Sequence, residues 1–364
     1  MRVLRFCVPG AALVAVVFAA VLGGRQSAPA GAGQVHALGT ISTERTSALA
    51  QKGPLGSGKP VTLAFGGDVH FESPIREELA ANPRTVLLSI RPVLNSADLA
   101  IVNLETAVTT RGTAAPKTYV FRAPPSAFAA LEAAGVDAAS MANNHGMDYG
   151  EVGLRDSIAA ARKARFPVIG IGLNAKEAYR PFRATIRGQR IAVLAATQVL
   201  DDNLIARWTA DPNAPGLASA KDVPRLVAAV RAARETSDTV VVFLHWGLEL
   251  AACPTTDQRT LARQLVGAGA DIVVGAHAHR LLGTGRMKRA LVSYGLGNFV
   301  WYSSRDVTTQ TGVLLVTATG RRIDDYRFVP ARIVSGAPRP LSGAARRGAL
   351  ASWRSLRGCT GLRP

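Results

Sequence analysis

The sequence predicts an α/β fold in which two mixed sheets pack together. Short β-branched apolar runs alternate with helical patterns from Val61 onward, which is typical of α/β domains. Two longer strand pairs, each with a turn between its strands, interrupt this alternation. A strand-rich section inside an alternating pattern favours two packed sheets over one doubly wound sheet.

Five strands of the buried type are expected, and a polar cluster follows each of them. These strands cover residues 61–65, 99–102, 136–140, 239–244 and 271–275. In α/β sheets, ligands bind in the loops beyond the carboxyl ends of the strands. The five polar clusters can therefore converge on one edge of the fold.

Helices and hairpins complete the predicted elements. Helical patterns cover residues 125–134, 150–164, 223–234 and 257–269, and several are followed by a glycine at which a helix would end. The hairpins cover residues 182–197, turning at 187–189, and residues 312–330, turning near 319–320. No internal repeat interrupts this order.

The two ends of the chain differ in composition from its centre. Arg2 and Arg5 precede an uncharged run from Phe6 to Gly24, so residues 1–30 are predicted to be an export signal cleaved after Ala30 or, if uncleaved, an N-terminal membrane anchor. Residues 31–59, rich in small residues and proline, are predicted to form a disordered tether. The catalytic domain is expected at 60–330 and a basic C-terminal tail at 331–364. The protein would then be secreted or belong to the cell envelope.

Positive charge is concentrated near the C-terminus. Residues 321–364 hold ten Arg against two Asp, which is +8 of the net charge of +18. Such a segment could contact an acidic polymer or the anionic surface of a membrane. It could equally be a solvated segment whose arginines reflect the codon usage of a GC-rich genome. No nucleic-acid partner is expected.

Two cysteines, Cys253 and Cys359, follow the predicted export signal. An even pair in an oxidising compartment could form a disulfide. The sequence gives no distance between them, and geometry decides whether they pair, so both outcomes remain open.

Histidines coincide with the polar clusters at the strand ends. Five of the six fall there, and the sixth, His36, lies in the predicted tether; the five are His70, His145, His245, His277 and His279. Imidazole together with carboxylate suits Zn, Mn or Fe, and the absence of Cys from the set argues against a structural zinc site.

Each candidate ligand also has a purely structural alternative. Asp68 and His70 stand at alternate positions, as do His277 and His279, and period-2 spacing predicts that each pair points the same way. An Asp-x-His pair alone is more often an exposed loop pair. Glu105 ends an apolar strand, where an unpaired charge is costly unless a cation compensates it.

Three further polar residues have ready structural explanations. Asp148 could cap the helix that begins at residue 150. Asn143 could form a turn. His245, at the end of a six-residue apolar strand, would by itself be a core residue.

Taken in chain order, these motifs resemble the dinuclear calcineurin-like metallophosphatase superfamily. The order is Asp-x-His, an acidic residue after a second strand, Asn-His, a lone His and His-x-His. Within that superfamily the segments 67–71, 103–105, 121–125, 142–150, 245–249 and 294–299 resemble the CapA family of capsule (poly-γ-glutamate) synthesis. The resemblance covers residues 61–329. It implies a metallophosphatase-like four-layer αββα sandwich with two packed mixed sheets.

The resemblance implies two divalent metal ions, Mn, Zn or Fe. Asp68, His70 and His279 would hold one ion, Asn144, His245 and His277 the other, and Glu105 would bridge them. Glu105 stands where the phosphatases have an aspartate, so the bridge is one methylene longer.

The resemblance also implies roles around the metals. His145 matches the general acid of the phosphatases. Five residues would contact the substrate or support the ligands, although Trp246 and Tyr294 could simply be packing residues. The five are Asn103, Arg122, Trp246, Tyr294 and Asn298.

The expected function is that of a metal-dependent hydrolase in the synthesis, attachment or processing of capsule polymer. Its substrate would be an anionic polymer, poly-γ-glutamate or a phosphoester, and a capsule synthase complex and the membrane surface are further candidate partners. Two alternatives remain open: a non-enzymatic factor that binds a polyanion or a synthase, and a metal-dependent phosphoesterase unrelated to capsule. Metal-assisted epimerisation of peptides fits less well with an export signal.

Overall fold

A computed structural model describes residues 56–364. The predicted export signal at 1–30 and residues 31–55 of the predicted tether lie outside the described residues. Among residues 56–364, every helix is too short or too polar to cross a lipid bilayer.

The first sheet has eight strands in the order β18-β17-β16-β1-β2-β5-β6, and β15 also pairs with β1. Strands β1, β2, β5 and β6 run parallel, whereas β16, β17 and β18 add an antiparallel extension. Their bounds are β1 Val61–Val69, β2 Leu99–Leu104, β5 Ala138–Ser140, β6 Val168–Ile169, β15 Asn298–Val300, β16 Gln310–Thr319, β17 Arg322–Val334 and β18 Ala337–Pro340.

The second sheet has six strands in the order β13-β14-β12-β11-β9-β8. Its central strands are parallel, and β8 and β13 close it with antiparallel edges. The bounds are β8 Phe182–Ile186, β9 Gln189–Thr197, β11 Thr239–His245, β12 Ile272–Ala276, β13 Thr284–Met287 and β14 Ala290–Ser293. Two short pairs lie outside the main sheets: β3 Ala107–Val108 with β4 Arg122–Ala123, and β7 Ile171–Gly172 with β10 Gly216–Leu217.

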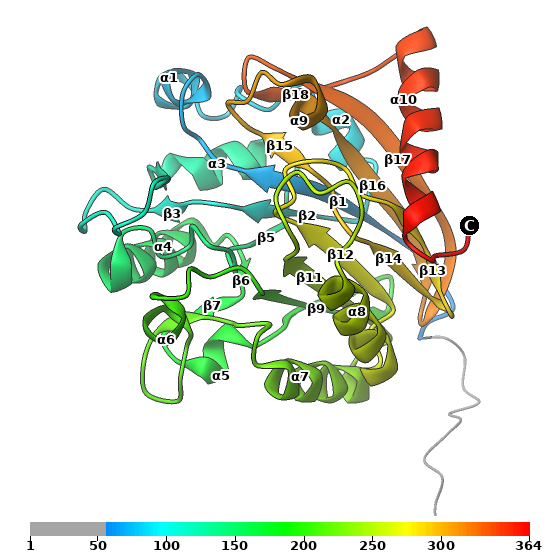
Figure 1. Cartoon of the computed structure of the whole chain (residues 1–364), viewed down its shortest axis with the longest axis horizontal. Helices are drawn as coiled ribbons and strands as arrows, with labels where there is room; N and C mark the ends of the chain where they lie inside the picture. The colour runs from blue at the N-terminus through cyan, green and yellow to red at the C-terminus, as the bar shows by residue number, and fades with distance from the viewer. Residues whose placement is uncertain (1–55) are drawn as a thin grey trace, which may run out of the picture. The chain divides into compact units, whose positions relative to one another are not determined.

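Helices cover the outer face of each sheet (Figure 1). Apolar residues of both sheets form the core between them, where Phe65 of β1 and Phe243 of β11 lie 6.4 Å apart between ring centroids. The first sheet carries α1 Ile75–Ala81, α2 Arg91–Leu94, α3 Ser126–Ala133 and α4 Gly150–Ala164; the second carries α5 Ala175–Ala178, α7 Val223–Thr236 and α8 Thr256–Ala268. The predicted four-layer αββα sandwich with two packed mixed sheets is confirmed.

The four predicted helices are confirmed as α3, α4, α7 and α8. Local capping explains why α8 could be predicted: Thr255 and Gln258 form a capping box, and Gly269 ends the helix with φ of 117°. Both predicted hairpins are confirmed as β8–β9 and β16–β17. Ser57, near the end of the predicted tether, donates to the Arg187 carbonyl in the β8–β9 turn at 2.6 Å.

The basic segment 331–364 has regular structure. It contains the end of β17, then β18, α10 Gly343–Ser355 and the 3₁₀ turn η1 Leu356–Cys359, and α10 lies beside β17 (Figure 1). Trp353 of α10 stacks on Phe328 of β17 with ring centroids 5.0 Å apart. Of the two outcomes left open for the cysteines, the structure has the disulfide Cys253–Cys359, which ties η1 to the loop between β11 and α8. Two short helices, α6 Ile205–Trp208 and α9 Asp306–Thr309, complete the described elements.

Candidate metal centre

The fold brings ligand-type side chains from both sheets to one place. Asp68 lies near the end of β1 and Glu105 directly follows β2, whereas His245 is the last residue of β11 and His277 directly follows β12. The His277 amide donates to Asp68 Oδ2 at 3.1 Å, so the two sheets meet at this cluster. Asp68, Glu105 and His245 are fully buried.

Two overlapping groups of donors share Glu105. In one, ligand atoms of Glu105, His245 and His277 lie within 4.8 Å of one another; in the other, those of Asp68, Glu105 and His279 do. Five of the seven candidate metal ligands therefore lie in these two groups. Glu105 is the residue common to both, as a bridging ligand would be.

The remaining two candidate ligands lie at the cluster but outside these groups. Asn144 Oδ1 accepts a hydrogen bond from His245 Nε2 at 2.7 Å, so it faces a candidate ligand of the same predicted ion. His70 Nδ1 accepts from the Glu72 amide at 3.0 Å, and its Nε2 is buried without a partner. The His70 ring lies 4.1 Å from that of Trp301, between ring centroids.

The donor set fits divalent metal ions. Within the described residues, both carboxylate oxygens of Glu105, His70 Nε2 and His277 Nδ1 are buried and lack any hydrogen-bond partner. Buried polar atoms are rarely left unpaired, because desolvation is costly unless a partner or a cation compensates it. Imidazole nitrogens with carboxylate oxygens are the donors that Zn, Mn and Fe accept.

The pKa shifts of the buried donors also fit a metal site. Burial, with the neighbouring Asp68 carboxylate, raises the pKa of Glu105 well above its ordinary value. Burial lowers the pKa of His245 well below the ordinary value, and lowers the pKa of His277 to about 3. The imidazoles of His245 and His277 are therefore neutral at physiological pH, which is the form that binds metals. Burial also acts to lower the pKa of His279, but the hydrogen bond and charge of Asp68 outweigh that effect, so the pKa of His279 is instead raised.

Asn103 of β2 connects the two donor groups. Its Nδ2 donates to Asp68 Oδ1 at 2.9 Å and to His245 Nδ1 at 3.1 Å. Its Oδ1 accepts from Asn143 Nδ2 at 3.2 Å, and Asn143 in turn accepts from the His145 amide at 3.0 Å. Asn103 thus orients ligands of both groups, a supporting role of the kind expected for it.

Asn298 fixes the orientation of His279. His279 Nδ1 donates to Asn298 Oδ1 at 2.9 Å, while Asn298 Nδ2 donates to the Thr308 carbonyl at 3.0 Å. With its proton on Nδ1, the His279 ring keeps the Nε2 lone pair for a metal.

The prediction that His277 and His279 repeat strand geometry is wrong. Strand β12 ends at Ala276, and the two histidines have φ of 92° and 53°, in the left-handed region that non-glycine residues seldom adopt. Their side chains converge because the loop bends, and not because an extended chain alternates. Backbone strain of this kind clusters at functional sites.

His145 lies against the cluster and is held by Asp148. His145 Nδ1 donates to Asp148 Oδ2 at 2.5 Å, and His145 Nε2 lies 3.9 Å from Glu105 Oε1. Burial lowers the pKa of His145, and the Asp148 carboxylate opposes that shift. The Phe121 ring stacks on the imidazole at 4.0 Å between centroids.

The prediction that Asp148 caps α4 is wrong. The N-cap residue of α4 is Tyr149, which makes no side-chain cap. The Asp148 carboxylate is occupied elsewhere, because it also accepts from the Phe121 amide at 2.6 Å and from Lys117 Nζ at 2.9 Å.

Trp246 and Tyr294 lie in the core behind the second sheet. Both are fully buried, and Trp246 Nε1 donates to the Tyr294 carbonyl at 2.9 Å. Both side chains pack in the apolar core, as in the packing alternative, and the Tyr294 hydroxyl is buried without a hydrogen-bond partner among the described residues. Arg122 is half-buried, with its guanidinium carbon 4.0 Å from the centroid of the Tyr149 ring.

Two charged residues of the site, Glu249 and Lys117, had no role assigned to them from the sequence, although Glu249 ends one of the segments that carry the resemblance. Glu249 forms a third group of donors with His277 and His279, and a bond from the Leu250 amide to the Ala278 carbonyl at 2.9 Å holds its loop there. Its position four residues after the candidate ligand His245 was the feature of the sequence that could have indicated a place at the site. Lys117 donates to the Asn144 carbonyl and to Asp148, but it lies in a segment without periodic pattern, so nothing in the local pattern marked it.

Two packed mixed sheets with His, Asp, Asn and Glu donors at their strand ends are the arrangement that the resemblance to the metallophosphatases implies. Residues 62–303 match the family described as "Bacterial capsule synthesis protein PGA_cap". The chain belongs to this family.

Relatives in the family come from several bacteria. The chain is 29% identical to the "Capsule biosynthesis protein CapA" of Bacillus anthracis, over 78% of this chain and 70% of the relative. It is 28% identical to the "PGA biosynthesis protein CapA" of Bacillus subtilis, over 77% and 74%. A "probable polyglutamine synthesis accessory protein" of Mycobacterium tuberculosis is 29% identical over 56% of this chain and 55% of its own length.

Among solved structures, the chain is similar to a hypothetical protein from Thermus thermophilus, with 19% identity and a TM-score of 0.48 over 75% of this chain and 100% of that one. A likeness at that TM-score adds nothing to the assignment.

Proposed function

We propose that this protein is an exported metal-dependent hydrolase that acts on an anionic capsule polymer of the poly-γ-glutamate type. One observation carries the proposal: donors from the ends of β1, β2, β11 and β12 converge on Glu105, beside His145. Membership of a capsule-synthesis family supports the process, and the site supports the reaction.

Seven residues would hold two ions of Mn, Zn or Fe. Asp68, His70 and His279 would bind one, Asn144, His245 and His277 the other, and Glu105 both. Divalent ions supply Lewis acidity and lower the pKa of bound water, to about 7 at a good zinc site. Two such ions bring +4 against −1 each from Asp68 and Glu105, so the site keeps +2 and attracts anions.

His145 would move the proton of the reaction. Asp148 holds the ring through Nδ1, which leaves Nε2 directed at the donor cluster. A proton at that nitrogen can pass to the leaving group, and the same nitrogen can take a proton from water. Phe121, stacked on the ring, excludes water from that side.

Export and the substrate class rest on separate observations. Arg2 and Arg5 before the apolar run favour export, and the disulfide Cys253–Cys359 is typical of an oxidising compartment. The names of the Bacillus relatives refer to capsule and PGA synthesis, and we extend that process to this chain. A capsule synthase complex and the membrane surface are the partners this proposal includes.

Metal analysis of the chain, purified without a metal-affinity tag, tests the proposal when followed by assays on poly-γ-glutamate and on phosphoesters. We expect two metal equivalents and shortening of the polymer, with the His145→Ala variant much slower. Turnover of phosphoesters alone would point to a phosphoesterase unrelated to capsule. Bound metal without turnover would support the binding-factor alternative, and a protein that holds no metal would refute the proposal.

A further inference from the structure

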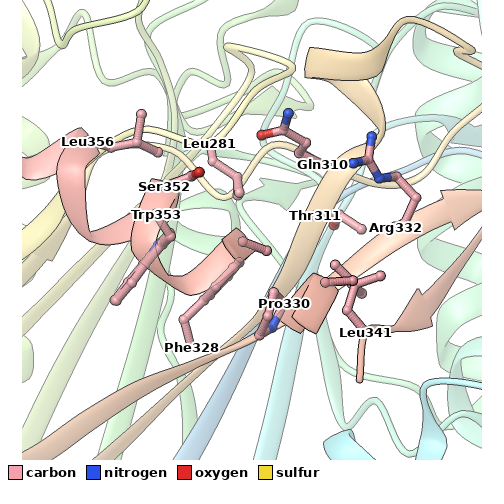
Figure 2. A pocket seen from close by; sticks show the side chains of 13 residues that line it. Leu281, Gln310, Thr311, Phe328, Pro330, Arg332, Leu341, Ser352, Trp353 and Leu356 are labelled. Carbon is pink, nitrogen blue, oxygen red and sulfur yellow. The ribbon is translucent and has the colours of Figure 1, made fainter. Parts of the chain in front are cut away.

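Helix α10 packs on β17 with a cavity on each side of the stacked pair Phe328 and Trp353. The first cavity, of about 270 Å³, is largely apolar (Figure 2). Its one charged residue, Arg332, is already engaged, because its guanidinium contacts the Asp306 carboxylate and donates to Thr309 Oγ1 at 3.1 Å. This cavity therefore offers no free charge.

The second cavity is lined by arginines. It has a volume of about 400 Å³, and we call it the arginine groove; it is formed by Arg327, Arg346, Arg354 and Arg357 around the aromatic rings of Tyr326, Phe328 and Trp353. No aspartate or glutamate lines it. Pro364 lines it as well.

These four arginines have no carboxylate partner within residues 56–364. The polar contact they do make is from Arg357 Nη1 to the Tyr326 hydroxyl at 3.4 Å. Elsewhere in residues 321–364, Arg321 pairs with Asp271 at 3.5 Å and Arg322 with Asp324 at 2.5 Å. Seven of the ten arginines in these residues have no ion pair with a described residue, and four of the seven line the groove.

The spacing of the arginines defines the size of a ligand. Arg346 and Arg354 are eight residues apart on α10, which is about 12 Å along the helix axis. A small anion could contact both only if the two side chains leaned toward each other along the helix. A ligand that neutralises both arginines is extended and carries repeated negative charges. Carboxylates suit these charges, because a planar guanidinium group can donate two parallel hydrogen bonds to one carboxylate.

We infer that the arginine groove binds an extended polycarboxylate chain at a site separate from the metal centre. The inference rests on the proposed function only for the identity of that chain, a capsule polymer. A membrane surface fits the groove less well, because membrane-bound helices insert large apolar side chains. In the described part of the chain, none of the exposed large apolar residues belongs to α10 or η1.

The groove is attached to the loop that borders the metal centre. The disulfide Cys253–Cys359 joins η1 to the loop that follows β11, and Arg259 Nη2 donates to the Cys359 carbonyl at 2.7 Å. Glu249, which belongs to a donor group of the site, lies in that same loop. A polymer held in the groove would thus be retained close to the loop without touching the reacting atoms. Loss of the groove should raise KM for the polymer and leave kcat unchanged.

Binding of fluorescein-labelled poly-γ-glutamate to the exported chain, followed by anisotropy, tests the inference. The variant is Arg346→Gln with Arg354→Gln, which removes two exposed charges that take part in no ion pair. We expect affinity to fall about tenfold, equivalent to about 1.4 kcal/mol. The matched control is Arg231→Gln with Arg347→Gln, which removes two exposed, unpaired charges outside the groove. The control should change affinity less than about twofold, within the usual range for such surface charges.

Three results would overturn the inference. Equal weakening in both double variants would show a general effect of net charge. Unchanged polymer binding in the groove variant would show that the polymer binds elsewhere. Loss of binding to phosphatidylglycerol vesicles, with polymer binding intact, would make the groove a membrane site. An unchanged thermal midpoint and metal content would show that the variant is folded, and Arg346→Lys with Arg354→Lys should keep most of the affinity.

The His145→Ala variant separates this inference from the proposed function. It should bind the polymer as tightly as the wild type, because His145 lies outside the groove. If the wild type binds polymer through the groove and never cleaves it, the groove stands and the hydrolase proposal fails.

Discussion

At the residue scale, Glu105 is a candidate ligand common to two donor groups. Neither oxygen of its carboxylate has a hydrogen-bond partner among the described residues. In the metal-free protein, burial and then the Asp68 carboxylate raise the pKa of Glu105 well above its ordinary value. The metal-free carboxyl therefore keeps its proton to higher pH than an exposed glutamate does.

Metal affinity should consequently increase with pH. A raised pKa means that the proton on Glu105 must leave before the carboxylate can bind, so metal binding releases a proton and is favoured at higher pH. Calorimetry of metal binding in buffers of different ionisation enthalpy, at about pH 6 and about pH 8, measures that release. The Glu105→Gln variant serves as the control and should bind metal weakly, with a smaller release of protons. An affinity independent of pH would contradict the role given to Glu105.

Two neighbouring residues should have opposite phenotypes. Replacing Asn144 by Ala should lower occupancy of one metal, because its Oδ1 faces His245 within the cluster. Replacing His145 by Ala should keep both metals and lose the roughly 10²–10⁴-fold contribution typical of general acid–base catalysis. Metal content and kcat of the two variants, measured side by side, separate the roles.

Each of the two outcomes for His145 has a clear consequence. Release of metal from His145→Ala would make that residue a ligand. Full activity in the same variant would leave the hydrolase without its proton donor and favour a protein that binds its substrate without turning it over.

The sequence predicted which ligand-type residues lie together better than it predicted the residues that support them. Ligand-type residues at the ends of apolar strands are visible in one dimension, because the strand pattern marks where each strand ends. The support of His145 by Asp148 and Lys117 depends on a loop, residues 109–121, that has no periodic pattern. Asp148 also has an obvious alternative as a helix cap, so its side-chain direction could not be inferred.

At the scale of elements, the carboxyl end of β12 packs tightly against the Trp246 side chain and the Tyr294 backbone. Gly275 of β12 leaves room for the Trp246 side chain, since a Cβ there would lie 2.1 Å from Trp246 Nε1 and 2.3 Å from the Tyr294 carbonyl oxygen. Ala276 alone separates Gly275 from His277. Packing in the core therefore positions the start of the His-x-His loop.

Gly275→Ala should destabilise the fold and disturb the site. Overpacking of a filled core typically costs about 1–3 kcal/mol, and here one of the atoms in the way belongs to the backbone. Thermal unfolding with metal analysis measures both effects. Gly267→Ala is the matched control: Gly267 lies in α8 with nothing within 4 Å of an added Cβ, so it should be neutral or stabilising by up to about 1 kcal/mol. Equal stability of the two variants would show that the space beside Trp246 is not restrictive.

Helices with strong end signals were predictable, whereas α10 was not. Helices α7 and α8 begin at Asp222 and Thr255, whose side chains accept hydrogen bonds from the first turn. Helix α10 has no such cap and only one buried side chain, Trp353. Most of its apolar residues are alanine, and the segment was interpreted from its arginine-rich composition as a tail.

At the scale of the whole molecule, the site exists because two sheets end at the same place. Asp68 belongs to the first sheet and His277 follows a strand of the second, 209 residues later, yet the two are joined by a hydrogen bond. Local patterns predicted the strands and both hairpins. They could not give the order of the strands, which decides which strand ends are neighbours. The strand pattern therefore predicted only that the polar clusters can converge, and the resemblance implied which residues would share an ion.

Removal of metal should therefore weaken the whole domain. A ligand that binds only the folded state stabilises it by RT ln(1 + [L]/Kd), or about 4 kcal/mol at a thousandfold excess over Kd. Since the donors come from both sheets, a bound metal ion would oppose separation of the two sheets. Loss of the metal would leave the buried, unpaired atoms of Glu105 and His277 without a compensating charge.

We expect a chelator to lower the thermal midpoint by roughly 5–10 °C, from the usual relation between free energy and midpoint for domains of this size. Calorimetry before and after chelation, followed by reloading with Mn²⁺ or Zn²⁺, measures the effect and its reversal. The same chelator should leave the midpoint of a Glu105→Gln, His277→Ala variant nearly unchanged, because that variant lacks the shared carboxylate and one imidazole. A wild-type midpoint that ignores the chelator, with metal shown to be gone, would mean that the cluster contributes no binding energy to the fold. The two sheets would then be held by their apolar core alone, and the unpaired buried donors would need another explanation.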